Sequence, residues 1–323
     1  MLNLFKVLAD STRLRLLRIL QQGDFTVQDL MQILDMGQSR ISRHLKLLSE
    51  AGLLRVEKQG TWHYYRLSPG EGLFHNIWPF LQTQLVGLDG QEHDAAGILQ
   101  VMAARRKRSQ DFFNRHARDW DNIHVELLSL PDYQERLLAM LPHGGLLVEI
   151  GVGTGSLLPL LAQQSARTIG LDHSPSMVAM ARETIADHQL ADKVDVRLAE
   201  MNHLPFADRS VRTIVMNQVL HHAEQPIEVL REIGRVLEIQ GVLVLADLTR
   251  HQHDWTRERL ADQWLGFKRS ELENWLAETG MLLTDYREFG DPAIQQSVLL
   301  LSASIINKRN EVTTEDLSDD RQV

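Results

Sequence analysis

Residues 146–155 read LLVEIGVGTG, an apolar stretch that runs into three alternating glycines. Residues 156–164 follow as SLLPLLAQQ, a pattern typical of a helix. Glycines at a bend between a strand and a helix allow the backbone to approach a ligand closely at the helix N-terminus. The spacing is G-x-G-x-G, however, because Ser156 stands where the dinucleotide-binding fingerprint requires glycine. The loop therefore predicts a ligand site but does not by itself identify the ligand.

The segment from residue 146 to about residue 304 alternates short apolar strands with helical patterns. This alternation is the signature of βαβ units around a parallel sheet, and it predicts a Rossmann-like α/β fold. Ligands of open α/β sheets bind at the carboxyl ends of the strands. The residues that directly follow each strand are therefore the candidates for the binding site.

Polar side chains follow the next three strands of this segment. Asp172 comes after the second strand, and its carboxylate can accept hydrogen bonds from both ribose hydroxyls of an adenosine. Glu200 and Met201 follow the third strand, where they can flank an adenine ring. Asn217 ends the fourth strand. Strand ends need polar residues in any fold, but candidate groups after four successive strands favour a binding site.

Four stretches carry a resemblance to a known family, namely VEIGVGTGSLL, TIGLDHSPSMV, RLAEMNHLPFADRSVRTIVMNQVLHH and LREIGRVLEIQGVLVLADL. In this order they resemble the class I methyltransferases of the broad small-molecule type (methyltransferase type 11-like), which use S-adenosylmethionine (SAM), over about residues 110–304. The resemblance implies a seven-stranded sheet with a reversed last strand. It implies that SAM, or its product S-adenosylhomocysteine (SAH), contacts Gly151, Gly153, Gly155, Asp172, Glu200 and Asn217, with His173 and Met201 beside the adenosine.

Aromatic residues precede the first strand of this domain. Phe112, Phe113 and Trp120 lie where members of the resembled family have a helical lid over the methionine part of SAM. An aromatic stripe that packs on the sheet is an equally good interpretation. The sequence leaves both interpretations open.

The sequence offers few catalytic or metal-binding groups. Methyl transfer from a sulfonium needs in-line positioning more than a catalytic side chain, and His221 and His222 are only weak candidates for a proton acceptor. The chain has no cysteine, which excludes thiolate metal sites and the arsenic methylation that depends on cysteines in this superfamily. His251 and His253 alone are too few ligands to hold an ion. We therefore expect no metal site.

The N-terminal residues predict a DNA-binding module. Thr26 can cap a helix, which ends at the tight turn of residues 35–37. The next helix spans residues 38–51, and a hairpin pattern follows at 53–67. A helix, a glycine turn, a second helix and a hairpin in this order are typical of a winged helix-turn-helix.

Polar and basic side chains occupy the outer face of the second helix. They are Gln38, Ser39, Arg40, Ser42, Arg43, His44 and Lys46, and the tip of the hairpin adds Lys58. Side chains in these places can reach base edges in the major groove and the phosphate backbone. A solvated basic face on a protein-interaction module is the alternative. The combination of features favours double-stranded operator DNA as the partner.

A second resemblance rests on LADSTRLRLLRIL and SRISRHLKLLSEAGLLRVEKQGTWHYYRLSP. These stretches closely resemble the winged-helix domain of the ArsR/SmtB family of bacterial transcriptional repressors, over about residues 2–86. The resemblance implies a homodimer built through the first and last helices of the module, with Phe74, Ile77, Trp78 and Leu81 in the interface. Metal-sensing members carry paired cysteines in the helix that here reads DFTVQDL, so soft-metal sensing at that place is chemically implausible.

The chain of 323 residues is long enough for two domains. Residues 1–70 carry ten Lys and Arg against six Asp and Glu, whereas the net charge of the whole chain is −9, which indicates a local surface for a polyanion. We expect a winged-helix domain at 1–86, a linker and helical lid at 87–140, a methyltransferase domain at 141–306 and a disordered tail at 307–323. No apolar run suits a membrane span or a signal peptide, so we expect a cytoplasmic protein with no membrane partner.

These observations together predict a DNA-binding transcriptional regulator that senses SAM or SAH. The alternative is an active SAM-dependent methyltransferase that acts on an unidentified small-molecule acceptor and is tethered to a winged helix. The cofactor motifs are intact, but no acceptor pocket can be recognised in the sequence. The sequence therefore leaves both functions open.

Overall fold

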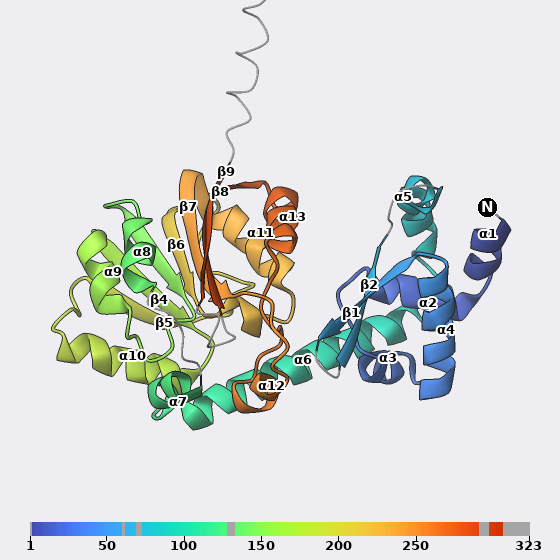
Figure 1. The fold of residues 1–323 in the computed structure, drawn as a ribbon, viewed down its shortest axis with the longest axis horizontal. Helices are drawn as coiled ribbons and strands as arrows, with labels where there is room; N and C mark the ends of the chain where they lie inside the picture. Colours follow the sequence, from blue (N-terminus) through green and yellow to red (C-terminus); the bar gives the residue numbers. More distant parts are fainter. Residues whose placement is uncertain (1, 60–61, 69–72, 128–132, 291–296, 306–323) are drawn as a thin grey trace, which may run out of the picture. The chain divides into compact units, whose positions relative to one another are not determined.

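The computed structural model describes residues 2–59, 62–68, 73–127, 133–290 and 297–305. The chain forms two compact units (Figure 1). The first comprises Met1–Ser109 with Gln252–Arg259, and the second comprises Gln110–His251 with Leu260–Val323. The tail expected at 307–323 lies outside the described residues. In the described part of the chain, no helix is long and apolar enough to cross a membrane.

The first unit is a helix-turn-helix core with a two-stranded sheet (Figure 1). Its elements are α1 (Leu2–Leu8), α2 (Ser11–Leu20), α3 (Val27–Leu34), α4 (Gln38–Glu50), β1 (Leu54–Gln59), β2 (Trp62–Leu67), α5 (Leu73–Leu85), the first part of α6 (Gln91–His116), and α12 (Trp255–Arg259). β1 and β2 pair antiparallel, with Leu54 opposite Leu67. This architecture confirms the predicted helix-turn-helix with its hairpin.

Local signals in the sequence explain how this core is built. The Thr26 hydroxyl accepts a hydrogen bond from the Asp29 amide, and the Asp29 carboxylate accepts one from the Thr26 amide, which forms a capping box at the start of α3. Ile41, Leu45 and Leu48 of α4 are fully buried. Their spacing places them on one face of the helix and leaves the opposite face for the polar residues.

The apolar stripe of α5 packs mainly inside its own unit. Phe74 and Trp78 are each 6% exposed, and their ring centroids lie 5.2 Å apart. The large apolar side chains of α1 and α5 that remain exposed are Leu2 and Phe5 on α1 and Leu73 and Phe80 on α5. An apolar stripe shows which face of a helix is buried but not whether its own core or a second copy covers it. Phe74 and Trp78 thus pack within this unit, and the dimer interface stays a prediction.

The first part of α6 belongs to this unit, which extends past the domain end expected at residue 86. Asp94 is 1% exposed and forms ion pairs with Arg15 and Arg18 of α2, each at 2.5 Å. Gly97 allows α6 to lie directly on α3, because a Cβ at this position would be 2.9 Å from the Ile33 Cα. A buried carboxylate with two guanidinium partners and a close backbone contact fix this part of α6 to the core.

The second unit contains the α/β fold. Its strands are β3 (Leu146–Ile150), β4 (Arg167–Asp172), β5 (Val194–Leu198), β6 (Val211–Asn217), β7 (Leu237–Leu248), β8 (Met281–Gly290) and β9 (Ser297–Ile305). Its helices, after the last part of α6, are α7 (Trp120–Leu127), α8 (Gln134–Ala139), α9 (Leu158–Gln164), α10 (Pro175–Asp187), the short 3₁₀ helix η1 (Leu220–His222), α11 (Pro226–Val236) and α13 (Arg269–Glu278).

The seven strands form one sheet in the order β5-β4-β3-β6-β7-β9-β8. The pairs from β5 to β7 are parallel, and β9 runs antiparallel to both β7 and β8. This confirms the predicted seven-stranded sheet with a reversed last strand. The strand order reverses its direction at β3, between β4 and β6. The carboxyl ends of these strands therefore form the crevice at which open α/β sheets bind their ligands.

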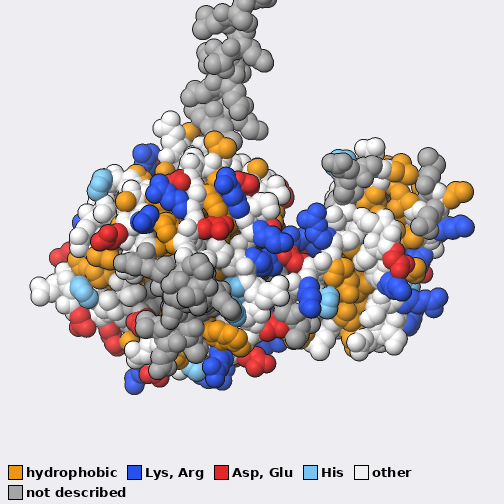
Figure 2. Space-filling model, in the orientation of Figure 1, with side chains coloured by type: hydrophobic (Ala, Val, Ile, Leu, Met, Phe, Trp, Pro, Cys, Tyr) orange, Lys and Arg blue, Asp and Glu red, His pale blue; other side chains and the backbone are white. Residues whose placement is uncertain are grey.

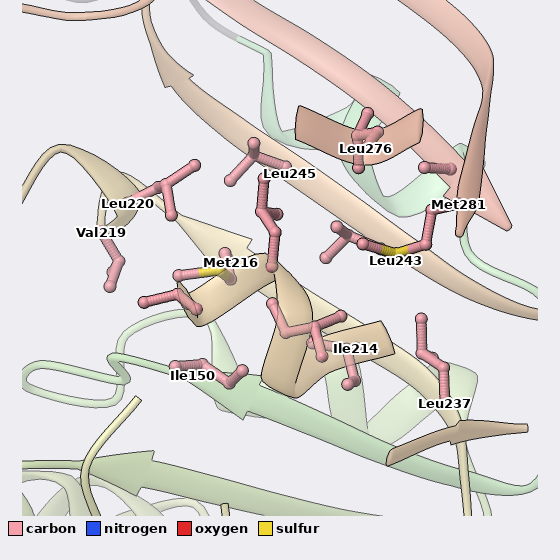
Figure 3. Packing of buried hydrophobic residues seen from close by; sticks show 14 of the residues in the cluster. Ile150, Ile214, Met216, Val219, Leu220, Leu237, Leu243, Leu245, Leu276 and Met281 are labelled. Carbon is pink, nitrogen blue, oxygen red and sulfur yellow. The ribbon is translucent and has the colours of Figure 1, made fainter. Parts of the chain in front are cut away.

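Alternate residues of the central strands face opposite helical layers. Ile214 and Leu245 belong to the large apolar cluster that also contains Leu276 of α13 (Figure 3). Val215 faces the other layer, where it packs in a cluster with Leu161 of α9. Because helices cover both faces, the strands are buried on both sides, and this explains why they read as nearly continuous apolar runs.

Candidate functional site

A pocket of about 750 Å³ opens at the carboxyl ends of β3, β4 and β6, within the second unit. Seven of the residues predicted to bind the cofactor or to act in catalysis line it, namely Gly151, Gly153, Asp172, His173, Met201, Asn217 and His222. Gly155, Glu200 and His221 are not among the lining residues. The order of the strands therefore brings most of the candidates into one cavity.

The glycine loop combines left-handed backbone with close packing. Gly151 has φ +73°, and a Cβ there would lie 2.4 Å from a methyl group of Val219. Gly153 has φ +54°, and apart from Gly153 and its two chain neighbours no atom of the described chain lies within 4 Å of the place of its missing Cβ, so the loop is open there. Gly155 instead packs against Ala181 of α10, with a separation of 3.0 Å from a built Cβ. Only glycine combines these backbone angles with such close approach.

Asp172 is held in place at the end of β4. Its Oδ2 accepts a hydrogen bond from the Gly153 amide at 3.0 Å, and its Oδ1 accepts one from the Ser174 amide at 2.9 Å. The residue is 7% exposed and lines the pocket. Each carboxylate oxygen has two lone pairs, so both can accept a further bond from a ligand hydroxyl. The carboxylate is thus oriented before any ligand arrives.

Glu149 is a site residue that the sequence interpretation missed. It is 2% exposed and lines the pocket from β3. Burial, together with the nearby charge of Asp172, raises the pKa of Glu149 to about 8. Among the described residues, none donates a hydrogen bond to its Oε2. An acidic residue inside the otherwise apolar stretch LLVEI was the signal that could have identified it.

Residues from α6, α7 and the segment before α8 complete the pocket. Phe113 packs edge-to-face against Trp120 and His222, with ring centroids 5.0 and 4.9 Å apart. Tyr133 donates a hydrogen bond to Asn217 Oδ1 at 2.7 Å. Phe113 and Trp120 line the pocket, whereas Phe112 does not. Phe113 and Trp120 therefore belong both to a packed apolar cluster and to the pocket wall, and a lid over SAM stays a prediction.

His221 and His222 lie in different surroundings. His222 lines the pocket beneath Phe113, whereas His221 is buried behind the wall. The Nδ1 of His221 lies 2.7 Å from Oδ1 of Asp247, and its Nε2 lies 3.5 Å from Oδ1 of Asp262. Burial alone would lower the pKa of the His221 imidazole, but the two carboxylates outweigh burial and raise this pKa. Of the two histidines, His222 is the one that can face a ligand.

In the first unit, the candidate DNA-binding residues lie along one face of α4. Gln38, Ser39, Arg40, Arg43 and Lys46 are exposed, and so is Lys58 on the hairpin. Figure 2 shows Lys and Arg side chains over the part of this unit where Figure 1 draws α4.

Two candidates of this face are less accessible. Ser42 and His44 are half-buried. The imidazole of His44 lies 3.7 Å from the Asp10 carboxylate, and burial lowers its pKa although Asp10 acts in the opposite direction. The exposed basic residues are therefore the stronger candidates for direct DNA contacts.

Comparison with known proteins assigns both units. Residues 10–56 match the family model described as bacterial regulatory protein, arsR family, and residues 148–245 match that of a methyltransferase domain. The chain joins an ArsR-family domain to a methyltransferase domain. The first match covers α2 to β1 of the helix-turn-helix core, and the second covers the strands that build the pocket.

Curated relatives resemble one domain each. The ArsR-family domain is similar to the arsenical resistance operon repressor of Escherichia coli (strain K12), with 54% identity over 21% of this chain and 59% of the relative. The methyltransferase domain is similar to the arsenite methyltransferase of Halobacterium salinarum, with 35% identity over 35% of this chain and 29% of the relative. Both matches span less than two thirds of the relative's own length.

A solved structure supports the fold of the methyltransferase domain. It is the complex between the Haloferax volcanii Trm112 methyltransferase activator and a methyltransferase, in which one chain superimposes with a TM-score of 0.51 at 20% identity. The match covers 60% of this chain and 98% of the other. At this identity the likeness shows the shared fold.

Proposed function

We propose that the chain is a cytoplasmic, homodimeric transcriptional regulator that binds operator DNA and whose methyltransferase domain senses SAM or SAH. The single observation that carries this proposal is the helix α6. Residues in its first part are fixed to the ArsR-family core, and Phe113 in its last part lines the pocket. One continuous helix therefore belongs to the DNA-binding unit and to the ligand site.

The pocket residues fit an adenosyl ligand that carries positive charge. The Asp172 carboxylate is oriented for ribose hydroxyls, and the open space at Gly153 leaves room for the ligand beside the loop. Glu149 places a buried carboxyl group in the same pocket. SAM carries a sulfonium and an ammonium group, and SAH keeps only the ammonium. A cationic ligand would therefore stabilise the ionised form of Glu149.

The first part of α6 reaches the helix-turn-helix through buried charges. The Arg105 side chain, 7% exposed, pairs with Asp29 of α3 at 2.6 Å. Its guanidinium also lies 5.7 Å from the ring centroid of Phe25. A short turn joins α3 to α4, which carries the DNA-binding face. A displacement of Arg105 would therefore move α3 and, through this turn, α4. The charge-assisted hydrogen bond between Arg105 and Asp29 therefore links α6 to α3.

The last part of α6 contacts the loop that follows Asp172. Gln110 donates a hydrogen bond to the His173 carbonyl at 2.7 Å, and Asn114 Oδ1 accepts one from the Ser174 hydroxyl at 2.7 Å. Phe113 lies between them in sequence and faces the pocket. A ligand that repositions this loop would act directly on the helix. A ligand shifts such an equilibrium only through its different affinities for the two states.

On the DNA side, we propose that Arg40, Arg43 and Lys46 contact the duplex, supported by Gln38, Ser39, Ser42, His44 and Lys58. The exposure of the basic residues on one face of α4 supports this assignment. The dimer is expected to use exposed apolar residues of α1 and α5 such as Phe5 and Phe80, which are 52% and 70% exposed. A two-fold symmetric dimer would prefer an inverted repeat.

An active methyltransferase is the second candidate function. The observation that favours it is His222, which lines the same pocket as Asn217. An imidazole there can accept a proton from a small-molecule acceptor as the methyl group is transferred. When bound, SAM would supply the methyl group, and this chain's residues would orient it and exclude water. Turnover of SAM to SAH with a small-molecule acceptor would distinguish this candidate from a pure sensor.

Titration calorimetry on the full chain tests the ligand assignment. SAM and SAH should both bind the wild type, and Asp172→Ala should weaken both, because the oriented acceptor for the ribose is lost. Asp195→Ala is the matched control, since Asp195 lies on the neighbouring strand β5, is 45% exposed and does not line the pocket. Unchanged affinities in the Asp172 variant would place the ligand elsewhere.

A further inference from the structure

Three buried side chains with metal-binding atoms converge next to the pocket. His221 and His222 come from η1, and Asp262 comes from the segment between α12 and α13. They are 2%, 8% and 3% exposed, and one donor atom from each lies within 4.8 Å of the others. The sequence analysis could not bring them together, because 40 positions separate Asp262 from His222. The expectation of no metal site rested on the lack of such a set.

The backbone fixes the geometry of this cluster. The amides of Gln263 and Trp264 donate hydrogen bonds to the His221 carbonyl at 3.0 and 2.9 Å. The Trp264 indole donates another to the Ala223 carbonyl at 2.9 Å. The segment that carries Asp262 is therefore bound directly to η1. The arrangement of donors is a property of the folded core rather than of a surface loop.

A fourth residue orients His221. Asp247 of β7 is 0% exposed, and its Oδ1 lies 2.7 Å from the His221 Nδ1. The same oxygen accepts a hydrogen bond from the Leu248 amide at 2.7 Å. Asp247 thus holds the Nδ1 side of the ring, and Nε2, which lies 3.5 Å from Asp262, is the atom that a metal ion could bind when the ring is neutral. Histidines that bind metals are held by a carboxylate in this way.

In this buried site the Nε2 of His221 and the Oδ1 of Asp262 lie close enough together for one cation to bind both. A separation of 3.5 Å suits a metal ion, because ligands about 2.0–2.1 Å from a tetrahedral Zn²⁺ lie about 3.4 Å apart. The Nδ1 of His222 lies 3.9 Å from the same oxygen of Asp262 and 3.4 Å from the Ala261 carbonyl oxygen.

We propose that His221, His222 and Asp262 bind one Zn²⁺ ion, with Asp247 as the residue that orients His221. Two imidazole nitrogens and one carboxylate oxygen are donors that zinc prefers, whereas Mg²⁺ and Ca²⁺ prefer oxygen alone. Because His222 lines the pocket, the ion lies at the pocket wall. The site is independent of the SAM-sensing proposal, since it would bind metal whether or not the domain senses SAM.

Metal binding to the untagged full chain tests this proposal. After chelator treatment and its removal, the chain is titrated with Co²⁺, whose visible absorption reports coordination by nitrogen and oxygen, and is then dialysed against Zn²⁺. We expect one ion per chain. Asp247→Asn should weaken binding about 10–100-fold, as is typical when the residue that holds a metal ligand is changed.

Two further variants and a control locate the ion. Asp262→Asn keeps the shape of the side chain but removes its charge, and it should lose the ion while circular dichroism shows the fold unchanged. His222→Ala should lose it as well. His188→Ala, which removes an exposed histidine of the same unit, should bind as the wild type does. Absence of a stoichiometric ion would overturn the proposal and leave a shared proton between His221 and Asp262. If the Asp262 and His222 variants bound the ion as tightly as the wild type, the ion would lie elsewhere and the proposal would be overturned.

Discussion

Replacing Glu149 by Gln should change how SAM binding and protein stability depend on pH. The substitution keeps the size and shape of the side chain and removes its ability to ionise. In the ligand-free protein the pKa of Glu149 is raised to about 8, so at pH 7 roughly nine tenths of the chains carry it protonated. Positive charge on bound SAM favours the ionised form, and binding should therefore release a proton.

The sign of the effect on binding follows from this release. Affinity of the wild type for SAM should rise with pH between about 6 and about 8, by at most about tenfold per pH unit, and should level off above the pKa of the free protein. The Gln variant should lack this dependence. Calorimetry in buffers of different ionisation enthalpy measures the proton release directly. Equal pH profiles for both proteins would refute the reasoning.

The same pKa predicts the effect on stability. A carboxyl group whose pKa rises from 4.5 in the unfolded chain to about 8 in the folded one destabilises the fold as it ionises. Its favourable contribution is complete below about pH 4.5 and is lost as pH rises through about 8. The loss is about 3 kcal/mol at pH 7 and about 5 kcal/mol above pH 8, as orders of magnitude. Denaturant unfolding should show the Gln variant gaining stability over the wild type with rising pH, and a constant difference would contradict the account.

Three further substitutions test the other parts of the account. Gly153→Val should abolish binding of SAM and SAH, because a β-branched residue is strained at φ +54° and its side chain would fill the open space. Retained binding would show that the ligand does not bind beside this loop. Arg43→Ala should weaken binding to a selected duplex by about 1–3 kcal/mol if Arg43 reads a base, or should reduce the salt dependence of binding if Arg43 contacts a phosphate. Mobility-shift titrations at several salt concentrations measure both effects. Unchanged affinity together with unchanged salt dependence would contradict a DNA contact by Arg43. Arg105→Ala should destabilise the ArsR-family domain by about 1.5–3 kcal/mol, because the charge-assisted hydrogen bond from Arg105 to the half-buried Asp29 would be lost. Arg108→Ala, at an exposed position of the same helix, is its control, and equal unfolding midpoints for the two variants would contradict the assigned role of Arg105.

The sequence predicted those features that depend on local pattern. The glycine spacing and the residues after each strand placed Gly153, Asp172 and Asn217 in the pocket, because parallel strands bring their carboxyl ends to one edge. The spacing of Ile41 and Leu45 likewise identified the buried face of α4. In these cases a periodicity of two or 3.6 residues carries the information about burial.

Features that depend on contacts between distant segments were not predictable in this way. Tyr133 reaches Asn217 from a segment without a recognisable motif, and Asp262 reaches His221 only because the intervening chain folds back. Glu149 was visible as a charge in an apolar strand, but its orientation into the pocket required the structure. Residues Phe74 and Trp78 show the same limit, because an apolar stripe does not reveal what covers it.

Binding to DNA in the presence of each ligand tests the central claim most directly. A duplex is first selected from a random library by the full chain, and its affinity is then measured at one fixed salt concentration with saturating SAM, saturating SAH or neither. If the methyltransferase domain reports its ligand through α6, the curves should differ by about 5–150-fold in affinity, the range of a typical coupling free energy. We expect SAH to be the ligand that releases DNA. Three identical curves would contradict the sensor function and would leave a methyltransferase domain tethered to a DNA-binding domain.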